Sequence, residues 1–325
     1  MSWYQNTRRL SQCNLTEIDG RVCDLSVWKQ YWKQNHIDGI VVNASGIVSY
    51  FRSDDPSQYC SPYLGNRDLF GEFVQAGREA GLSVIARMDC SRTDISLVRL
   101  HPDWFSLDST GYPYSMDGRY FTCVNGDYYK KHIPAQMEEI IRRYHPDAFT
   151  DNSWQGLPAD RICYCKVCRR QFKEECGMEL PRAQDWKDPT YLRWLHWSIE
   201  CRMRNWRLFN TVTRKHDPDC LWLGMVNADP VSVHCAMYDL HEILQSSPFV
   251  MVDHQNRDAL NGFEQNIVNG LLLHELGRKL TGIAESMARY ARGIYTFRRS
   301  AMPGNEAFLW SLCGIAGGLR PWLHI

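Results

Sequence analysis

Four cysteines near the middle of the chain have the spacing of a metal site. Cys163, Cys165 and Cys168 lie within six residues of one another, so three thiolates can face one ion. Tetrahedral zinc needs a fourth ligand. Cys176 is a candidate but lies too far along a predicted helix, whereas Cys123 lies on the loop before the preceding helix. We expect a closed, structural Zn²⁺ site with Cys123 as fourth ligand; buried or partly oxidised thiols are the alternative.

A carboxylate precedes this cluster. The segment DAFTDNSW (147–154) begins as a short apolar strand and ends in a polar turn that carries Asp151. A metal bound by the cysteines would fix the loop that follows the strand, and with it the position of Asp151. A carboxylate at a strand tip beside such a loop is typical of an active site.

Short apolar runs bounded by turn residues predict eight strands that alternate with helices. Such runs are typical of strands covered on both faces. The expected strands span residues 37–46, 82–92, 101–111, 147–154, 221–227, 248–257, 281–286 and 320–325, and residues 1–20 are expected to be a polar lead-in. Eight strand and helix repeats favour a (β/α)8 TIM barrel, with residues 1–325 forming a single domain.

Polar residues stand at the ends of most of these strands. In a barrel of this type, the carboxyl ends of the strands surround the active site. Some of these side chains are expected to cap helices or pair with arginines, but a set of carboxylates in one cup raises their pKa values and is usually kept for chemistry. The residues are Asn43, Arg87, Asp89, Asp108, Asp151, Asn152, Asn227, Asp253, His254 and Glu285.

Two carboxylates on strands across a barrel suit glycoside hydrolysis. One protonates the leaving oxygen, and the other attacks the anomeric carbon or activates water. Asp151 and Glu285 lie on the fourth and seventh predicted strands, and Asp253 and Asp89 are the substitutes. A metal-dependent hydrolase that uses Asp253 and His254 is a weaker hypothesis, because no His-x-His or His-Glu-x-x-His pattern supports it.

The composition limits the partners. The chain has 37 basic and 37 acidic residues, so nothing in its charge indicates a nucleic-acid or anionic-membrane partner. No apolar run approaches the roughly 18 residues that span a bilayer, and the N-terminus lacks an apolar signal core. We therefore expect a cytoplasmic protein. Twelve tryptophans agree weakly with a carbohydrate-binding cleft.

Two resemblances refine this interpretation. TDNSWQG followed by CYCKVCRRQF resembles the strand-four region of the family 42 β-galactosidases, and the segments around Glu285 and Cys123 resemble that family's nucleophile segment and fourth zinc ligand. The family's acid/base glutamate corresponds to Ser153, and a serine cannot serve as that acid. VVNASGIVSYF, GNRDLFGEFVQAGREAGLSVIARMDCSRT and MVDHQNR are more similar to hypothetical glycosyl hydrolases related to α-L-fucosidases, which implies that Asp151 is the nucleophile.

These resemblances imply a retaining exo-glycoside hydrolase that acts on α-L-fucose ahead of β-D-galactose. Asp151 and Glu285 would share the nucleophile and acid/base roles. The residues expected to bind the sugar are Asn43, Arg87, Asp89, Asn152, Trp154, Asp253 and His254. A non-catalytic carbohydrate-binding barrel is the alternative. The relatives usually carry C-terminal domains, which we expect to be absent here, and a homo-oligomer is a further hypothesis.

Overall fold

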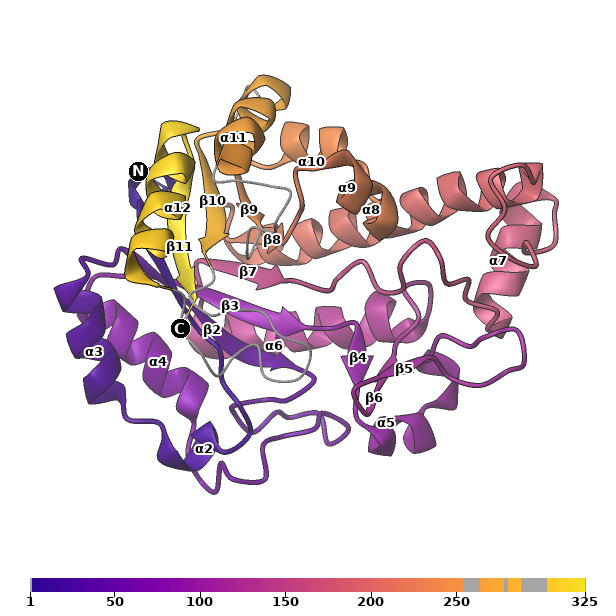
Figure 1. Cartoon of the computed structure of the whole chain (residues 1–325). Coiled ribbons are helices and arrows are strands. Elements are labelled where there is room, and N and C mark those ends of the chain that lie inside the picture. The colour runs from indigo at the N-terminus through magenta and orange to yellow at the C-terminus, as the bar shows by residue number, and fades with distance from the viewer. Residues whose placement is uncertain (1, 254–263, 278–279, 288–302, 325) are drawn as a thin grey trace.

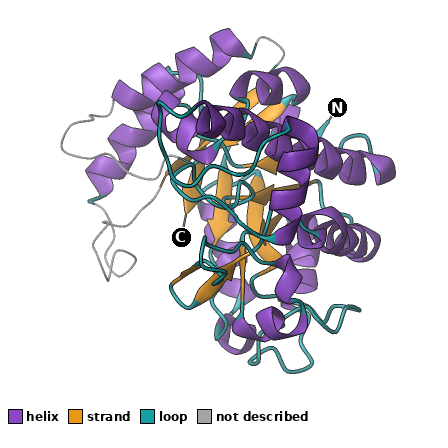
Figure 2. Cartoon of the chain, turned by 90° about the vertical axis from the view of Figure 1, so that its right-hand side faces the viewer, coloured by secondary structure: helices purple, strands orange, loops and turns teal. Residues whose placement is uncertain are grey.

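Eight parallel strands form a sheet that curls almost into a barrel, with helices around it (Figures 1 and 2). A computed structural model describes residues 2–253, 264–277, 280–287 and 303–324. The barrel strands are β1 (Leu10–Cys13), β2 (Gly39–Gly46), β3 (Ser83–Asp89), β7 (Ala148–Asp151), β8 (Leu221–Gly224), β9 (Phe249–Val252), β10 (Gly282–Met287) and β11 (Arg320–His324).

The strand order in the sheet is β8-β7-β3-β2-β1-β11-β10-β9, with every neighbouring pair parallel. The two edge strands approach each other beyond β8, where Val226 accepts a hydrogen bond from the backbone N–H of Asp253 (2.9 Å) and donates one to the carbonyl of Met251 (2.9 Å). The predicted (β/α)8 barrel is therefore confirmed.

One expected strand was wrong, and one barrel strand was missed. The first barrel strand is β1, within the segment expected to be a polar lead-in, and residues 101–111 do not belong to the barrel. Ser11 and Gln12 of β1 are polar yet buried by the neighbouring strands, so the sequence lacks the apolar run of a covered strand. Phe105 instead bridges to Thr122 beside a small antiparallel sheet of β4 (Arg92–Thr93), β5 (Ser115–Met116) and β6 (Arg119–Phe121).

Helices cover the outside of the barrel, and aspartates begin several of them. Asp68 accepts a hydrogen bond from Gly71 N–H (2.9 Å) and Asp188 from Thr190 N–H (2.8 Å), as N-cap residues do. The helices are α1 (Trp3–Asn6), α2 (Asp19–Val22), α3 (Leu25–Gln34), α4 (Leu69–Glu79), α5 (Ile95–Leu100), α6 (Ile133–Tyr144), α7 (Lys166–Cys176), α8 (Pro189–His216), α9 (Pro230–Ala236), α10 (Leu240–Ser246), α11 (Glu264–Leu276) and α12 (Gly304–Ala316), with a 3₁₀ turn at Pro102–Trp104 and a π-helical turn at Tyr128–His132.

The longest helix, α8, joins two hydrophobic cores. Trp206 and Phe209 in its C-terminal half pack against the outside of the barrel, in the core that most of the sheet shares. Tyr191 and Trp194 in its N-terminal half belong to a second core, together with the cysteine cluster and Phe172 of α7. In Figure 1 this half of α8 and α7 extend from the barrel at the right. The helix therefore fixes the second core relative to the barrel sheet.

Candidate active site and metal centre

A polar network lies at the carboxyl ends of β1, β2 and β3. The Arg87 guanidinium pairs with Asp89 (3.1 Å), and Asn43 donates a hydrogen bond from Nδ2 to the other carboxylate oxygen of Asp89 (3.1 Å). The guanidinium also donates to Oδ1 of Asn14 (2.5 Å), which accepts a second hydrogen bond from Gln12. The structure thus brings together three of the predicted site residues, Asn43, Arg87 and Asp89.

This network is buried but keeps unused hydrogen-bonding groups. Among the described residues, none accepts from Nε of Arg87 or donates to Oε1 of Gln12, although both atoms are buried. The side chain of Asp89 stays 19% exposed. Arg87 and Asn43 each donate to one oxygen of Asp89, and because each oxygen can accept more than one hydrogen bond, the exposed part of the carboxylate can still accept from a polar ligand such as a sugar.

Sequence reasoning missed Gln12 and Asn14. Both lie on or just after β1, in the segment expected to be a lead-in. The sequence did contain a signal for this strand. A (β/α)8 barrel begins with a strand, and residues 10–13 precede the first predicted helix.

Asp151 lies at the end of the fourth barrel strand but is completely buried. Its Oδ2 accepts a hydrogen bond from Cys90 N–H (2.8 Å), and its Oδ1 accepts from the backbone N–H (2.6 Å) and hydroxyl (3.0 Å) of Ser153. Burial, together with the nearby charge of Asp89, raises its pKa to about 6, although these hydrogen bonds oppose the shift. Both carboxylate oxygens are therefore occupied by the protein.

The alternation of β7 explains this burial. Ala148 packs in the interior of the barrel, whereas Phe149 packs in the core between the sheet and the helices. Because side chains alternate along a strand, Asp151 belongs to the same face as Phe149, and Asn152 follows on the other face. Asn152 is half-buried. The buried thiol of Cys90, whose pKa is raised by burial and by the charge of Asp151, lies on the same side.

The turn after Asp151 is fixed by buried side chains. Trp154 is fully buried, packs against Trp206, and donates a hydrogen bond from its indole nitrogen to the carbonyl of Met225 (3.0 Å). In this structure it is a core residue, so it offers no surface to a sugar. The buried guanidinium of Arg202 donates to the carbonyls of Gln155 (2.8 Å), Leu157 (2.7 Å) and Ser198 (2.9 Å), which ties the turn to α8.

The remaining predicted site residues lie on β9 and β10. Asp253 directly follows β9 and is half-buried. Glu285 lies in β10, where its backbone is in register with Val252 and Pro321, and only its backbone is described. His254 lies outside the described residues. The backbone thus places Asp253 and Glu285 on neighbouring strands, on the side of the sheet away from Arg87 in the strand order.

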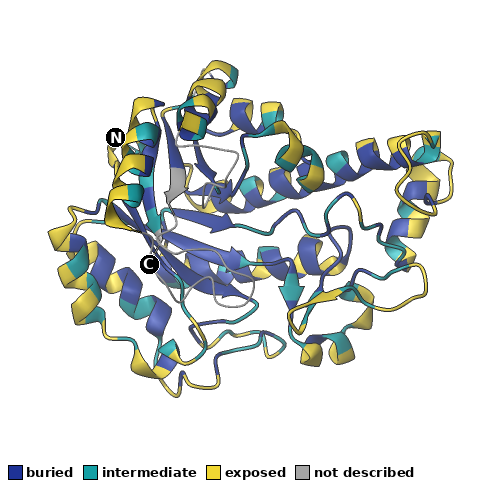
Figure 3. Ribbon diagram, in the orientation of Figure 1, coloured by how far each residue is buried: buried dark blue, intermediate teal, exposed yellow. Residues whose placement is uncertain are grey.

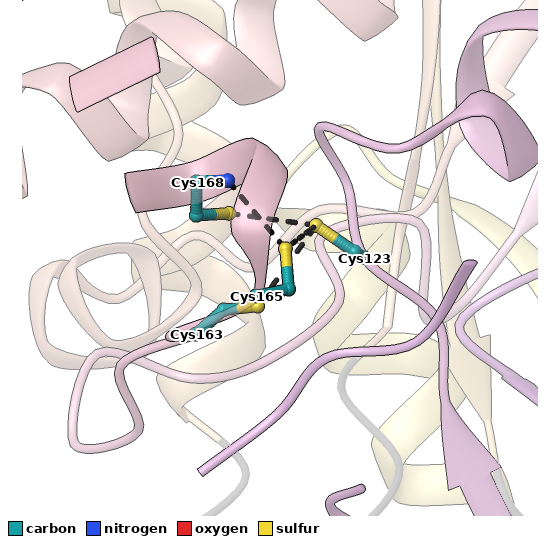
Figure 4. Close-up of side chains that lie close together, drawn as sticks. All are labelled: Cys123, Cys163, Cys165 and Cys168. Atoms are coloured by element: carbon teal, nitrogen blue, oxygen red, sulfur yellow. Dashed lines mark hydrogen bonds between the residues drawn. The ribbon is translucent and has the colours of Figure 1, made fainter. Parts of the chain in front are cut away.

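The four predicted cysteine ligands converge (Figure 4). Their sulfur atoms all lie within 4.8 Å of one another, and Cys123 Sγ lies 3.5, 3.6 and 3.9 Å from the sulfurs of Cys168, Cys165 and Cys163. Four sulfurs around a tetrahedral ion with bonds of about 2.3 Å are separated by about 3.8 Å. Since a disulfide needs about 2.05 Å, these distances fit four thiolates around one metal ion and exclude bonded pairs among them.

Neighbouring groups support a thiolate set. Asn125 lies with Nδ2 3.3 Å from Cys168 Sγ, and the backbone N–H of Cys168 points to Cys165 Sγ at 3.5 Å. Cys165 is also the N-cap of α7, where the helix dipole favours negative charge. Cys176 is at the far end of α7 and does not join the cluster, as expected.

Comparison with known proteins agrees with this architecture. Residues 27–152 match the family model described as hypothetical glycosyl hydrolase 6. No curated protein matches the chain.

Among the described helices, none has the length and apolar character to cross a membrane.

Three solved structures illustrate the similarity. A β-galactosidase from Bacillus circulans sp. alkalophilus has a TM-score of 0.71 at 14% identity, over 98% of this chain and 50% of that one. An α-L-fucosidase isoenzyme 2 from Paenibacillus thiaminolyticus has a TM-score of 0.56 at 16% identity, over 96% and 49%. The PgaB (BpsB) glycoside hydrolase domain from Bordetella bronchiseptica has a TM-score of 0.73 at 15% identity, over 98% and 94%. At these identities the likeness is one of fold, and the chain spans about half the length of the first two structures.

Proposed function

We propose that this chain is a glycoside hydrolase that removes a terminal sugar, with α-L-fucosides ahead of β-D-galactosides. The observation that carries the proposal is the network of Asn14, Asn43, Arg87 and Asp89 at the carboxyl ends of neighbouring barrel strands. It combines a carboxylate that is 19% exposed with a guanidinium and amides that are largely buried. Such groups suit the hydroxyls of a sugar.

The proposed catalytic carboxylates are Asp151 and Glu285, on the fourth and seventh barrel strands. Catalysis by Asp151 requires its carboxylate to leave the hydrogen bonds from both Cys90 and Ser153, because these occupy both of its oxygens. Asp89 is the accessible carboxylate on the strand beside it, and Asp253 follows the strand beside Glu285. These two residues are the substitutes for the catalytic pair.

The proposed sugar contacts come from Asn43, Arg87, Asp89, Asn152 and Asp253, with His254 kept from the sequence prediction. Arg87 is held by Asp89 and Asn14, so its guanidinium is already oriented before a ligand arrives. A preoriented group loses less conformational freedom on binding. Trp154 is withdrawn from this set because it is part of the core.

A panel of aryl glycosides, including an α-L-fucoside and a β-D-galactoside, tests the proposal. We expect one glycoside to be cleaved. The single variant Glu285→Gln should lower kcat/KM for that glycoside by several orders of magnitude, and so should one of the single variants Asp151→Asn and Asp89→Asn. Asp108→Asn, at a half-buried turn residue that does not belong to the barrel strands, is the matched control. Absence of cleavage across the panel by the wild type would refute the hydrolase proposal.

A non-catalytic carbohydrate-binding barrel is the second candidate. Ser153 stands where the family 42 resemblance places the acid, and it binds Asp151 instead of leaving the carboxylate accessible. In this case a sugar raises the melting temperature of the chain by mass action without being cleaved. Arg87→Met should abolish that increase, because it removes the central donor of the network.

We propose that the ion held by Cys123, Cys163, Cys165 and Cys168 is Zn²⁺ with a structural role. Four sulfur ligands complete a tetrahedron, so no position stays open for substrate. The site also lies in the second core, apart from the polar network. Metal analysis of the purified chain should give one zinc per chain, and the Cys165→Ser variant should give less.

A further inference from the structure

Two neighbouring helices, α11 and α12, expose large apolar side chains on one face. Phe308 is 63% exposed and Leu271 is 60% exposed. Figure 3 shows both helices with much exposed surface at the top and upper left of the barrel. The residues of this apolar face are Val268, Leu271, Leu272, Phe308, Leu309, Leu312 and Ile315.

The apolar face is unusual for a helix at a protein surface. An outer helix normally carries charged side chains toward water, whereas a helix that is apolar all round is buried. The segment Gly304–Ala316 contains one charged residue, Glu306, and neither helix contains a lysine or arginine. This pattern predicts that the face is covered in the functional assembly.

The two helices hold the apolar face rigidly. Asn266 of α11 donates a hydrogen bond from Nδ2 to the carbonyl of Trp310 in α12 (3.3 Å). Gly270 allows close contact, because a Cβ there would collide with the backbone of Gly317. At the far end of α11, Nε2 of His274 lies 3.2 Å from the carbonyl oxygen of Gly318. The face is therefore preformed, and a partner need not order it.

The area of the face matches that of a dimer interface. These seven residues are between 36% and 63% exposed, which gives an apolar patch on the order of 500 Å², near the upper end of what monomeric proteins expose. A standard interface buries about 800 Å² on each partner, and about two-thirds of a homodimer interface is apolar. Apart from any polar rim, the seven side chains supply the apolar area that one protomer of such a dimer needs.

The chemistry of the face selects the partner. A helix that binds an anionic membrane surface carries lysines or arginines on its polar side, and these two helices carry none. The charged or titratable residues within the two described helices are Glu264, His274, Glu275 and Glu306. An uncharged apolar face is complementary to itself in a two-fold symmetric contact. We propose that this face binds a second copy of the chain and forms a homodimer.

Sedimentation equilibrium of the full chain tests this proposal. We expect the wild type to reach twice the monomer mass of 37.9 kDa as its concentration rises. Leu271→Glu and Leu312→Glu should each weaken the dimer at least tenfold, because a two-fold interface buries every new charge twice. Glutamate suits a helix, so these variants should fold. Circular dichroism checks that they do.

Leu100→Glu is the matched control, since Leu100 on α5 is also 63% exposed but lies outside the apolar face. It should leave the dimer unchanged. The proposal fails if the wild type stays monomeric, if both variants of the face dimerise like the wild type, or if Leu100→Glu dissociates the dimer equally. It also fails if the wild type stays monomeric and binds anionic phospholipid vesicles through this face.

Discussion

Replacing Asp151 by asparagine should flatten the dependence of stability on pH. The folded protein raises the pKa of Asp151 to about 6, from an ordinary value of 3.8. A carboxyl with a raised pKa in the folded state binds its proton more tightly there than in the unfolded chain. Its contribution to stability is therefore complete below pH 3.8 and is lost as the pH rises through about 6.

The shift sets the magnitude. At 1.36 kcal/mol for each pKa unit, ionised Asp151 costs about 3 kcal/mol at alkaline pH. Between about pH 8 and pH 5 this group alone adds about 1.4 kcal/mol to the free energy of unfolding. The asparagine variant should lack this increase. The asparagine amide also turns its NH2 group toward one of the backbone N–H groups that donate to the carboxylate, so the variant should be less stable than the wild type at acid pH, where the wild-type carboxyl is neutral.

Urea unfolding at several pH values measures this difference. Two further variants should shift the pKa of Asp151 in opposite directions. Asp89→Asn removes a nearby negative charge and should lower the pKa of Asp151, which weakens the pH dependence. Ser153→Ala removes a hydroxyl that donates to the carboxylate and should raise that pKa. If Asp151→Asn keeps the wild-type slope between about pH 5 and pH 8, the assignment of the shift to Asp151 is refuted.

Three further predictions concern stability. Removing the metal with a chelator, or replacing Cys165 by serine, should unfold the second core and release α7 to proteolysis; intact protection after complete metal loss would count against a structural ion. Arg202→Met should lower the free energy of unfolding by about 2–5 kcal/mol, because three buried carbonyls lose their donor. The control Arg204→Met, at an exposed arginine, should lower it by less than about 1 kcal/mol. Equal losses for the two variants in urea titrations would contradict this reasoning. Gly224→Ala should cost about 1–3 kcal/mol, because its Cβ would lie 2.8 Å from the ring of Trp154, and an unchanged melting temperature would disprove this contact.

The parts that the sequence predicted well depend on local patterns. Continuous apolar runs such as those of β2 and β9 can be covered only from both faces, so they indicate barrel strands without knowledge of their neighbours. The spacing of Cys163, Cys165 and Cys168 likewise predicts a shared site, because a short loop brings the three sulfurs together. Cys176 was set aside because it lies too far along a predicted helix, and Cys123 was preferred because it lies on the loop before the preceding helix.

The parts that it missed depend on tertiary contacts. β1 contains polar residues that neighbouring strands bury, so its pattern resembles a loop. Trp154 resembled a sugar platform because only the packing of Trp206 and Met225 around it reveals a core residue. The direction of Asp151 depends on which face of β7 is inside the barrel, and a strand of four residues buried on both faces does not reveal this from its sequence.

The metal centre and Asp151 occupy two ends of one tethered segment. The chain leaves β7 at Asp151, is held by Arg202 at Gln155 and Leu157, and reaches the cysteines from Cys163 onward. Arg202 lies on α8, and the N-terminal half of α8 packs in the second core with the four cysteines. A displacement of the cysteine cluster would therefore move α8, and with it Arg202 and the turn after Asp151. Opening the turn at Ser153 to free Asp151 is then opposed by the same helix. Loss of the metal should therefore make Asp151 easier to expose as well as destabilise the second core, and the pKa of Asp151 should fall toward its ordinary value.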